Sequence, residues 1–378
     1  MRSKLRVAIA TSGRFHVFDL ARELYALGHD VTLYSYVPRK RARKFGIGDE
    51  YYVSLLSFTA PALIMRRLVS RYFPWATEWF LFKSLNWAVK FRLRPCDVFV
   101  CMSGIYLEAA HYAKREFNAK IWLERGSQHI LSQDEILQKI PGAERPSLLT
   151  ARRELAGYEI ADRIVVPSQH VEESFRRDPQ AFAKLFRNAL GVDLDAFPLC
   201  EHEKAHNPFT LLSVGNWSLR KGCDVLTKAV TTFSDMRLLH VGPVSDAHFP
   251  TDDQRFVRVG AVPQTELSRF YARADALVLA SREDGFGMVI LQALASGLSV
   301  ICSDRTGGPD LLYTPALAKR ITIIPSDDVI ALTSAIRSLK ERLSKDDHLP
   351  PLAQEDREPL SWASYARRYS DELHREFA

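Results

Sequence analysis

Residues 281–308 read SREDGFGMVILQALASGLSVICSDRTGG, the most informative stretch of the chain. An apolar run over 276–279 precedes it and predicts a buried strand. Gly285 and Gly287 then predict a turn, and the run after them predicts a helix that ends at Gly297. Strand, glycine turn and helix in this order are typical of a doubly wound parallel sheet, which presents backbone N–H groups to a phosphate.

Apolar strand-like runs and helix-like runs alternate in two series along the chain, which predicts an α/β protein with two parallel sheets covered by helices on both faces. We expect a first domain over 1–197, a polar linker over 198–208, a second domain over 209–360 and a helix over 361–378 that crosses back to the first domain. The expected strands are 5–10, 30–34, 98–102, 120–123 and 163–166 in the first series, and 210–214, 237–241, 276–279 and 299–301 in the second.

Composition limits the class of protein. With 378 residues, 47% of them hydrophobic, the chain can bury substantial cores and is not disordered. Its five cysteines form no CxxC pair, so we expect neither a zinc site nor a disulfide framework, and a reducing compartment is the simpler interpretation. We expect no signal peptide and no spanning helix. A cytoplasmic location follows, and any membrane contact would be peripheral, at the inner face.

Basic residues are concentrated over 39–94, where they alternate with aromatic residues. A helix expected over 75–91 has apolar side chains on nearly every side, with Lys83 and Lys90 on one narrow stripe, so something must cover it. A packed hairpin of helices, docking on an anionic membrane and nucleic-acid binding are the alternatives. We expect no nucleic-acid partner, because no RNA- or DNA-binding motif accompanies the segment.

Several segments, in chain order, resemble glycosyltransferase family 4. They are VAIATSGRFHVFDLARELYALGHDV, ADRIVVPSQHVEESF, GVDLDAF, LLSVGNWSLRKGCDVLTKAV and VGAVPQTELSRFYARADALVLAS, followed by the stretch quoted above. The resemblance implies the GT-B fold, in which two Rossmann-like domains face an interdomain cleft. It also implies a hexosyltransferase that moves a sugar from a nucleotide-sugar donor to a glycan or lipid-linked acceptor with retained anomeric configuration. Residues 46–94 match nothing in the family pattern.

Arg220 and Lys221 follow the strand expected over 210–214, in the loop before a helix opens, so both can reach the crevice at the carboxyl end of the sheet. The resemblance implies that they hold the donor diphosphate, where each charge-assisted hydrogen bond contributes roughly 1.5–3 kcal/mol. The alternative is a pair of solvated basic residues. Many family members have Arg at the position of Asn216, and Arg220 would supply that charge here.

Asp284 and Gln292 occupy the positions of two glutamates in the family pattern. The resemblance implies that the first contacts the transferred sugar and the second the nucleotide ribose. Gln292 lacks a charge, so donor binding would be weaker. Glu283 is the alternative at the sugar position. The whole turn also has a structural interpretation, in which the glycines only form a tight turn and Gln292 packs beside a core helix.

In the first domain the resemblance places a glycine loop, here Gly13 with Arg14 and His16, near the donor diphosphate and the acceptor. Similar enzymes also have a histidine near the donor sugar, after the strand expected over 120–123. Four residues of this chain are candidates for that position, Glu124, Arg125, Ser127 and His129. We take Glu124 and His129 as the catalytic candidates. The alternative for a lone histidine is an ordinary hydrogen-bonded residue. The further donor-binding candidates are Val262, Gly285, Phe286, Gly287, Gly307 and Gly308.

No DxD motif lies in a strand-end loop, so we expect metal-independent transfer without a cofactor. In the family mechanism the acceptor attacks on the face from which the leaving group departs, and a donor phosphate oxygen takes its proton, so no carboxylate pair of the glycosidase type is required. A nucleotide-sugar epimerase of the same fold and a catalytically silent scaffold are the alternatives. The sequence leaves open the base, the sugar, the linkage and the acceptor, for which a cell-envelope polysaccharide intermediate is our expectation.

Overall fold

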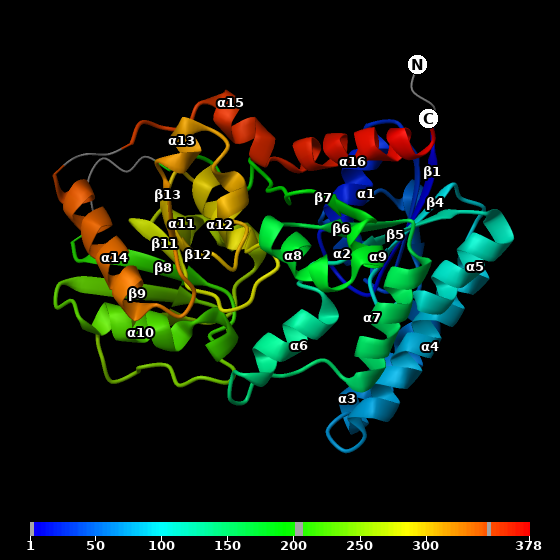
Figure 1. Cartoon of the computed structure of the whole chain (residues 1–378), viewed down its shortest axis with the longest axis horizontal. Helices are drawn as coiled ribbons and strands as arrows, with labels where there is room; N and C mark the ends of the chain where they lie inside the picture. The colour runs from blue at the N-terminus through cyan, green and yellow to red at the C-terminus, as the bar shows by residue number, and fades with distance from the viewer. Residues whose placement is uncertain (1–3, 201–206, 346–348) are drawn as a thin grey trace.

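A computed structural model describes residues 4–200, 207–345 and 349–378, and its strands form two parallel sheets (Figure 1). The first sheet has the order β3-β2-β1-β4-β5-β6-β7. Its strands are β1 (Arg6–Thr11), β2 (Asp30–Ser35), β3 (Tyr52–Ser54), β4 (Val98–Met102), β5 (Lys120–Glu124), β6 (Arg163–Val166) and β7 (Leu185–Arg187). The second has the order β10-β9-β8-β11-β12-β13. Its strands are β8 (Phe209–Val214), β9 (Met236–Val241), β10 (Phe256–Val259), β11 (Ala276–Leu279), β12 (Ser299–Ser303) and β13 (Ile321–Ile324).

Helices cover both faces of each sheet, as a parallel sheet with buried strands requires. The first domain holds α1 (Val17–Ala26), α2 (Arg39–Arg43), α3 (Leu56–Val69), α4 (Pro74–Arg92), α5 (Leu107–Phe117), α6 (Ile130–Gln138), α7 (Leu148–Ile160), α8 (Gln169–Ser174) and α9 (Pro179–Phe182). The second holds α10 (Cys223–Thr231), α11 (Ser268–Tyr271), α12 (Met288–Ala295), α13 (Pro315–Ala318), α14 (Val329–Ser344) and α15 (Gln354–Arg357). The last helix is α16 (Trp362–Glu376).

Helix α16 returns to the first domain and packs against α1 on one face of the first sheet (Figure 1). Its side chains Tyr365, Ala366, Tyr369 and Leu373 are buried in the same hydrophobic cluster as Val7 and Ile9 of β1. Helices α4, α5 and α7 cover the other face. The prediction of two Rossmann-like parallel sheets with a crossover helix is therefore confirmed. The expected linker over 198–208 lies largely outside the described residues, and the domain boundaries stay a prediction.

The strands that the sequence pattern identified are the apolar ones in the middle of each sheet. The four that it did not identify, β3, β7, β10 and β13, are at the ends of the two sheets and have only three or four residues each. Each of these four strands is paired on one side only and has partly exposed residues, so it carries little apolar pattern and its sequence resembles that of a loop.

The strand orders create a topological switch point in each sheet. In the second sheet the chain runs from β8 outward through β9 and β10, then returns to β11 on the other side of β8. In the first sheet β1 and β4 are such a pair. Loops that leave the carboxyl ends of two such strands diverge and leave room for a ligand between them. The fold therefore selects the loops after β8 and β11, and after β1 and β4, as the places to look for a site.

Candidate functional site

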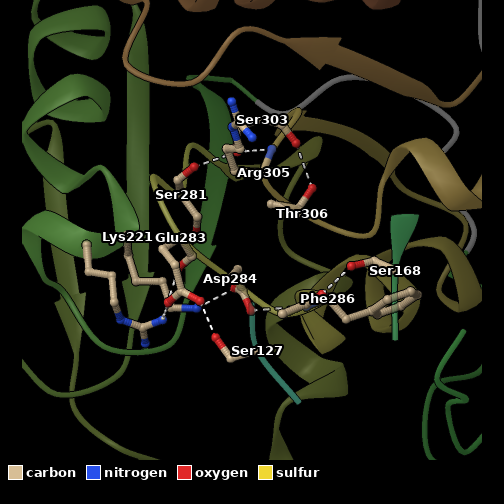
Figure 2. A network of polar contacts seen from close by, with 12 residues as sticks. Ser127, Ser168, Lys221, Ser281, Glu283, Asp284, Phe286, Ser303, Arg305 and Thr306 are labelled. Atoms are coloured by element: carbon tan, nitrogen blue, oxygen red, sulfur yellow. Dashed lines mark hydrogen bonds and ion pairs between the residues drawn. The ribbon is translucent and has the colours of Figure 1, made fainter. Parts of the chain in front are cut away.

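Two pairs of opposite charges lie at the switch point of the second sheet. Arg220 and Lys221 are in a short 3₁₀ turn (Leu219–Lys221) after β8, and Glu283 and Asp284 are in the loop after β11. Arg220 Nη1 donates to Glu283 Oε2 at 2.9 Å, and Lys221 Nζ donates to Asp284 Oδ2 (Figure 2). The structure thus brings together the basic pair and the acidic pair, which the sequence places about sixty residues apart.

The carboxylates are more deeply buried than their cationic partners. The Glu283 side chain is 1% exposed and that of Asp284 15%, against 36% for Arg220 and 22% for Lys221. Burial alone would raise the pKa of Asp284, but the Lys221 ammonium, with a smaller contribution from Arg220, more than offsets it, so the pKa lies below its usual value. Asp284 is therefore an anion at neutral pH, and positive charge faces outward from it.

Side chains of the first domain contact the loop after β11. Ser127, between β5 and α6, donates through Oγ to Glu283 Oε1. Ser168, which directly precedes α8, donates through Oγ to the carbonyl of Gly285 at 2.6 Å, and His170 Nε2 donates to the carbonyl of Asp284 at 2.7 Å. Because a carbonyl oxygen can only accept, His170 carries a proton on Nε2. The expected interdomain cleft is, at this point, a direct contact between the domains.

Gly285 is required by this contact between the domains. A Cβ atom at Gly285 would lie 1.7 Å from the carbonyl oxygen of Gly126, so only glycine allows the two loops to approach this closely. Gly287 has another role, because its φ of +81° lies in the left-handed region, where it begins α12. The two glycines that predicted one turn thus serve a domain contact and a helix start.

Phe286 packs against Gly307 in the loop after β12, and the next residue of that loop, Gly308, packs against Cys302 of β12. The Gly307 N–H donates to the Phe286 carbonyl at 2.6 Å, and a Cβ at Gly307 would lie 2.3 Å from the buried Phe286 ring. A Cβ at Gly308 would lie 2.2 Å from Cys302 Sγ. The small residues after β12 therefore let the second turn lie directly against the first.

Gln292 and Val262 lie behind the charged loops. Gln292 is buried on α12, and its Oε1 accepts a 2.7 Å hydrogen bond from the hydroxyl of the buried Tyr271. One acceptor position of the amide is thus used inside the protein. Val262 is half-buried and packs against the hydrophobic cluster that contains Ile290. Asn216, at the end of β8, is exposed.

The first domain contributes a connected set of hydrogen bonds around Glu124. His16 Nε2 lies 2.8 Å from Glu124 Oε2, and the Tyr369 hydroxyl of α16 donates to Glu124 Oε1, also at 2.8 Å. Glu124 is buried and its two carboxylate oxygens bond His16 and Tyr369, which orients the His16 ring; its catalytic role stays a prediction. Gly13 precedes His16 by three residues; the nearest atom to an added Cβ there is a carbon of Phe15 at 3.5 Å, an ordinary contact.

Arg14 and Arg125 are directed into the first domain. Arg14 Nη2 donates to Asp19 Oδ2 at 3.1 Å, and its guanidinium lies 4.7 Å from the centre of the Phe45 ring. Arg125 is buried and bonds Glu154 Oε1 at 2.9 Å. Both arginines therefore have partners in their own domain.

His129, a catalytic candidate from the sequence, has a structural place in the fold, and its catalytic role stays a prediction. The residue is 1% exposed, packs between Tyr158 and Phe175, and accepts the Leu131 N–H at Nδ1, which caps α6. Burial is the main cause that lowers its pKa to about 4. A neutral, capped and enclosed ring is placed to stabilise the loop after β5 and does not reach the charged loops.

Sequence reasoning missed the residues that connect distant parts of the chain. Ser168 and His170 follow the end of β6 by only a few residues, a position at the carboxyl edge of the sheet that could have identified them. Asp310 accepts the Gln169 N–H at 3.0 Å and pairs with Arg187 at 3.0 Å, again between domains. Tyr369 carried no local signal, because its partner Glu124 lies 245 residues away.

Residues 208–342, which include both charged loops, match the family model described as "Glycosyl transferases group 1". Among curated proteins, the GDP-mannose-dependent alpha-mannosyltransferase of Mycobacterium tuberculosis is 32% identical over 166 residues, which are 42% of this chain and 43% of that protein. The matched regions cover between 33% and 43% of the first curated relatives. The family match thus covers most of the second domain.

Solved structures resemble the chain over its whole length. The sucrose-phosphate synthase of Thermosynechococcus elongatus superposes with a TM-score of 0.71 at 18% identity and covers 99% of both chains. Anabaena Alr3699/HepE in complex with UDP-glucose has a TM-score of 0.68 at 13% identity, and the match covers 98% of this chain and 99% of that one. At such low identity the likeness defines the fold, which is GT-B, as the sequence resemblance implied.

The close approach at Gly285 predicts a difference between two glycine-to-alanine variants. Gly285→Ala places a methyl group into the Gly126 carbonyl and should cost about 1–3 kcal/mol of unfolding free energy, as overpacking does, and separate the domains. Gly13→Ala meets only ordinary contacts and should be close to neutral. Chemical denaturation and the radius of gyration from X-ray scattering measure both effects. Equal stability and equal size of the two variants would contradict the described contact.

The buried His129 predicts an acid-dependent loss of stability. Its folded pKa of about 4 lies below the ordinary value of 6.5, so on acidification the unfolded chain takes up a proton before the folded one does. This contribution to stability is complete above pH 6.5 and falls by about 1.4 kcal/mol per pH unit between 6.5 and 4.

His129→Asn keeps a capping acceptor and removes the titration. The variant loses packing, so its stability is lower throughout, but its unfolding free energy should depend less steeply on pH in this window. His240, whose pKa burial also lowers to about 4, is present in both proteins and cancels in the difference. Parallel pH profiles for wild type and variant would show that His129 is not held neutral.

Proposed function

We propose that the protein is a retaining, metal-independent hexosyltransferase of glycosyltransferase family 4, which uses a nucleotide-sugar donor. The observation that carries this proposal is the pair of cations, Arg220 and Lys221, beside Asp284 at the switch point between β8 and β11. A diphosphate needs positive charge, and a sugar next to it needs a hydrogen-bonding carboxylate. Both are supplied here by adjacent loops.

Arg220 and Lys221 would bind the donor diphosphate and stabilise the negative charge that develops on it as the sugar departs. Their present partners, Glu283 and Asp284, would have to give up these contacts. In the reaction the bond from the anomeric carbon to the phosphate oxygen breaks, and a bond from the same carbon to the acceptor oxygen forms on the same face. The acceptor proton goes to the donor phosphate oxygen. Asp284 would accept hydrogen bonds from the sugar hydroxyls.

The first domain would supply the acceptor side of the site. His16, held by Glu124, and the open backbone at Gly13 follow the carboxyl end of β1, next to the switch point of the first sheet; Tyr369 in turn bonds Glu124. We propose that a glycan or lipid-linked hydroxyl, such as that of a cell-envelope polysaccharide intermediate, binds there. Ser127, Ser168 and His170 would hold the donor loop against this domain.

Comparison with known proteins supports the proposal in two ways. The group 1 glycosyltransferase match spans the segment that contains Arg220, Lys221 and Asp284. A neighbour of the same fold is in complex with UDP-glucose, and a relative is described as dependent on GDP-mannose. These names differ in nucleotide base, so the base for this chain is a matter for experiment.

Removal of Lys221 should reduce donor-induced stabilisation. In a thermal-shift panel of UDP-, GDP- and ADP-sugars, one nucleotide series should raise the Tm of the wild type, because ligand that binds only the folded state stabilises it. Lys221→Ala should weaken donor binding roughly 10- to 100-fold, since a hydrogen bond to a charged group contributes about 1.5–3 kcal/mol. Each shift is taken relative to the same variant without ligand.

Lys340→Ala is the matched control for Lys221→Ala. Lys340 also pairs with a carboxylate, that of Asp235, but on the surface of the second domain, so its variant should retain the full donor shift. Incubation of the protein with the bound donor, without acceptor and in the presence of EDTA, then distinguishes a transferase from an epimerase. Slow donor hydrolysis supports a metal-independent transferase, and interconversion of free sugar nucleotides supports an epimerase. No Tm shift with any donor would favour a silent scaffold.

Gln292→Glu should strengthen donor binding. A carboxylate at this position offers a charged acceptor to the nucleotide ribose, and hydrogen bonds to charged acceptors are about twice as strong as neutral ones. We expect the donor Kd to fall about 3- to 10-fold in isothermal titration, with Tyr271 still able to donate to the new oxygen. Gln292→Leu is the opposite control and should weaken binding; a donor Kd unchanged in both variants would show that Gln292 does not face the donor.

A further inference from the structure

We propose that the α3–α4 hairpin (residues 56–94) docks on an anionic lipid surface. This inference concerns a surface remote from the charged loops and does not depend on the proposed reaction. None of the described helices is long and apolar enough to cross a membrane, so the contact would be a helical face that lies on the lipid surface.

The net positive charge of the hairpin equals that of the whole chain. Residues 56–94 contain seven basic residues and one acidic residue, Glu78, which gives a net charge of +6, equal to the net charge of all 378 residues. Arg66, Arg67 and Arg71 are exposed and form no ion pair with any residue that the structure describes. An uncompensated cluster of this kind attracts an anionic surface with about 1 kcal/mol per basic residue.

Large apolar side chains project from the same hairpin into solvent. Trp75 is 70% exposed and Leu68 is 69% exposed, although residues of these types are usually covered. The exposed apolar residues of the hairpin are Ile64, Leu68, Tyr72, Phe73, Trp75, Trp79, Phe80, Trp87 and Phe91. The packed hairpin that the sequence allowed is therefore present, with Phe58 of α3 in contact with the rings of Trp87 and Phe91, yet these two side chains stay more than half exposed.

The exposed aromatic rings alternate with basic side chains on α4. Trp87 and Phe91 stack with ring centres 5.7 Å apart, and Lys83 lies 5.8 Å from the centre of the Trp79 ring. Aromatic rings suit the boundary between headgroups and acyl chains, and long basic side chains reach from that boundary to the phosphates. The arrangement thus matches the two chemical layers of a lipid surface.

The hairpin is also placed where a flat surface could reach it. Figure 1 shows α3 and α4 along the outer edge of the first domain, with their connecting loop protruding on the side opposite to α16. Tyr72 and Phe73 lie in this loop and are exposed. Nothing else in the described part of the chain covers the tip, so it can insert without a change of fold.

Charge complementarity favours lipid over the other occupants. A second copy of the chain in a two-fold contact would place the +6 segment against itself, which is repulsive. A nucleic acid would pair with the basic residues and stack on the aromatic rings, but Ile64 and Leu68 are aliphatic and offer nothing on which bases can stack. Both aliphatic side chains fit an acyl boundary.

Vesicle co-sedimentation of the full chain tests the proposal. The protein should sediment with vesicles of phosphatidylcholine and phosphatidylglycerol and not with phosphatidylcholine alone, and added salt should weaken binding. Arg66→Gln/Arg67→Gln/Arg71→Gln should reduce the partition coefficient on the order of 100-fold. Trp75→Ser/Trp79→Ser should also release the protein, although it leaves the charge unchanged. Trp fluorescence should shift to the blue on binding only in proteins that retain these two residues.

A triple variant of the second domain is the matched control. Lys228→Gln/Arg269→Gln/Lys319→Gln removes the same charge from exposed positions and should bind anionic vesicles nearly as the wild type does. All variants should keep the donor-induced Tm shift, so failure of this proposal is separable from failure of the proposed function. The proposal is overturned by absence of binding to anionic vesicles, by equal losses in control and hairpin variants, or by binding to single-stranded nucleic acid or self-association in place of vesicle binding.

Discussion

The organising constraint of this molecule is the burial of two carboxylates, Glu283 and Asp284, at the point where β8 and β11 run side by side. A carboxylate removed from water needs a positive partner and further hydrogen bonds, otherwise the desolvation cost is several kcal/mol. Arg220 and Lys221 provide the charge, and Ser127 provides a hydrogen bond from the other domain. The sheet order brings the basic turn next to the two carboxylates, and the contact between the domains adds the further hydrogen bond that they need.

The sequence predicted those parts of the structure that local patterns encode. The central strands are continuous apolar runs, and Arg220, Lys221 and Asp284 could be placed at one edge because each follows such a run. The partners within this group could not be predicted. That Arg220 would bond Glu283 and Lys221 would bond Asp284 depends on the register of β8 against β11 and on how each loop turns, which no repeat or motif specifies.

Two histidines of the first domain show why side-chain partners could not be predicted from the sequence. His129 drew attention because it follows a strand, yet its side chain caps α6 inside the protein, whereas His170 follows the next strand and reaches the loop after β11. Both are histidines near the carboxyl end of a strand, so the pattern does not distinguish them. The difference arises from packing: aromatic rings enclose His129, while the start of α8 points toward the second domain.

Glu283 accepts hydrogen bonds from both domains, so binding of a donor at the proposed site would also affect the contact between the domains. Its carboxylate accepts from Arg220 in its own domain and from Ser127 in the other. A diphosphate that takes Arg220 would leave Glu283 with a hydrogen bond from the neutral Ser127 and with the nearby positive charge of Arg125, a weaker compensation for a buried charge than a direct ion pair. The loop could then restore the balance by moving toward solvent or by bonding the donor itself. Binding of the donor and the contact between the domains would therefore be energetically coupled through one side chain.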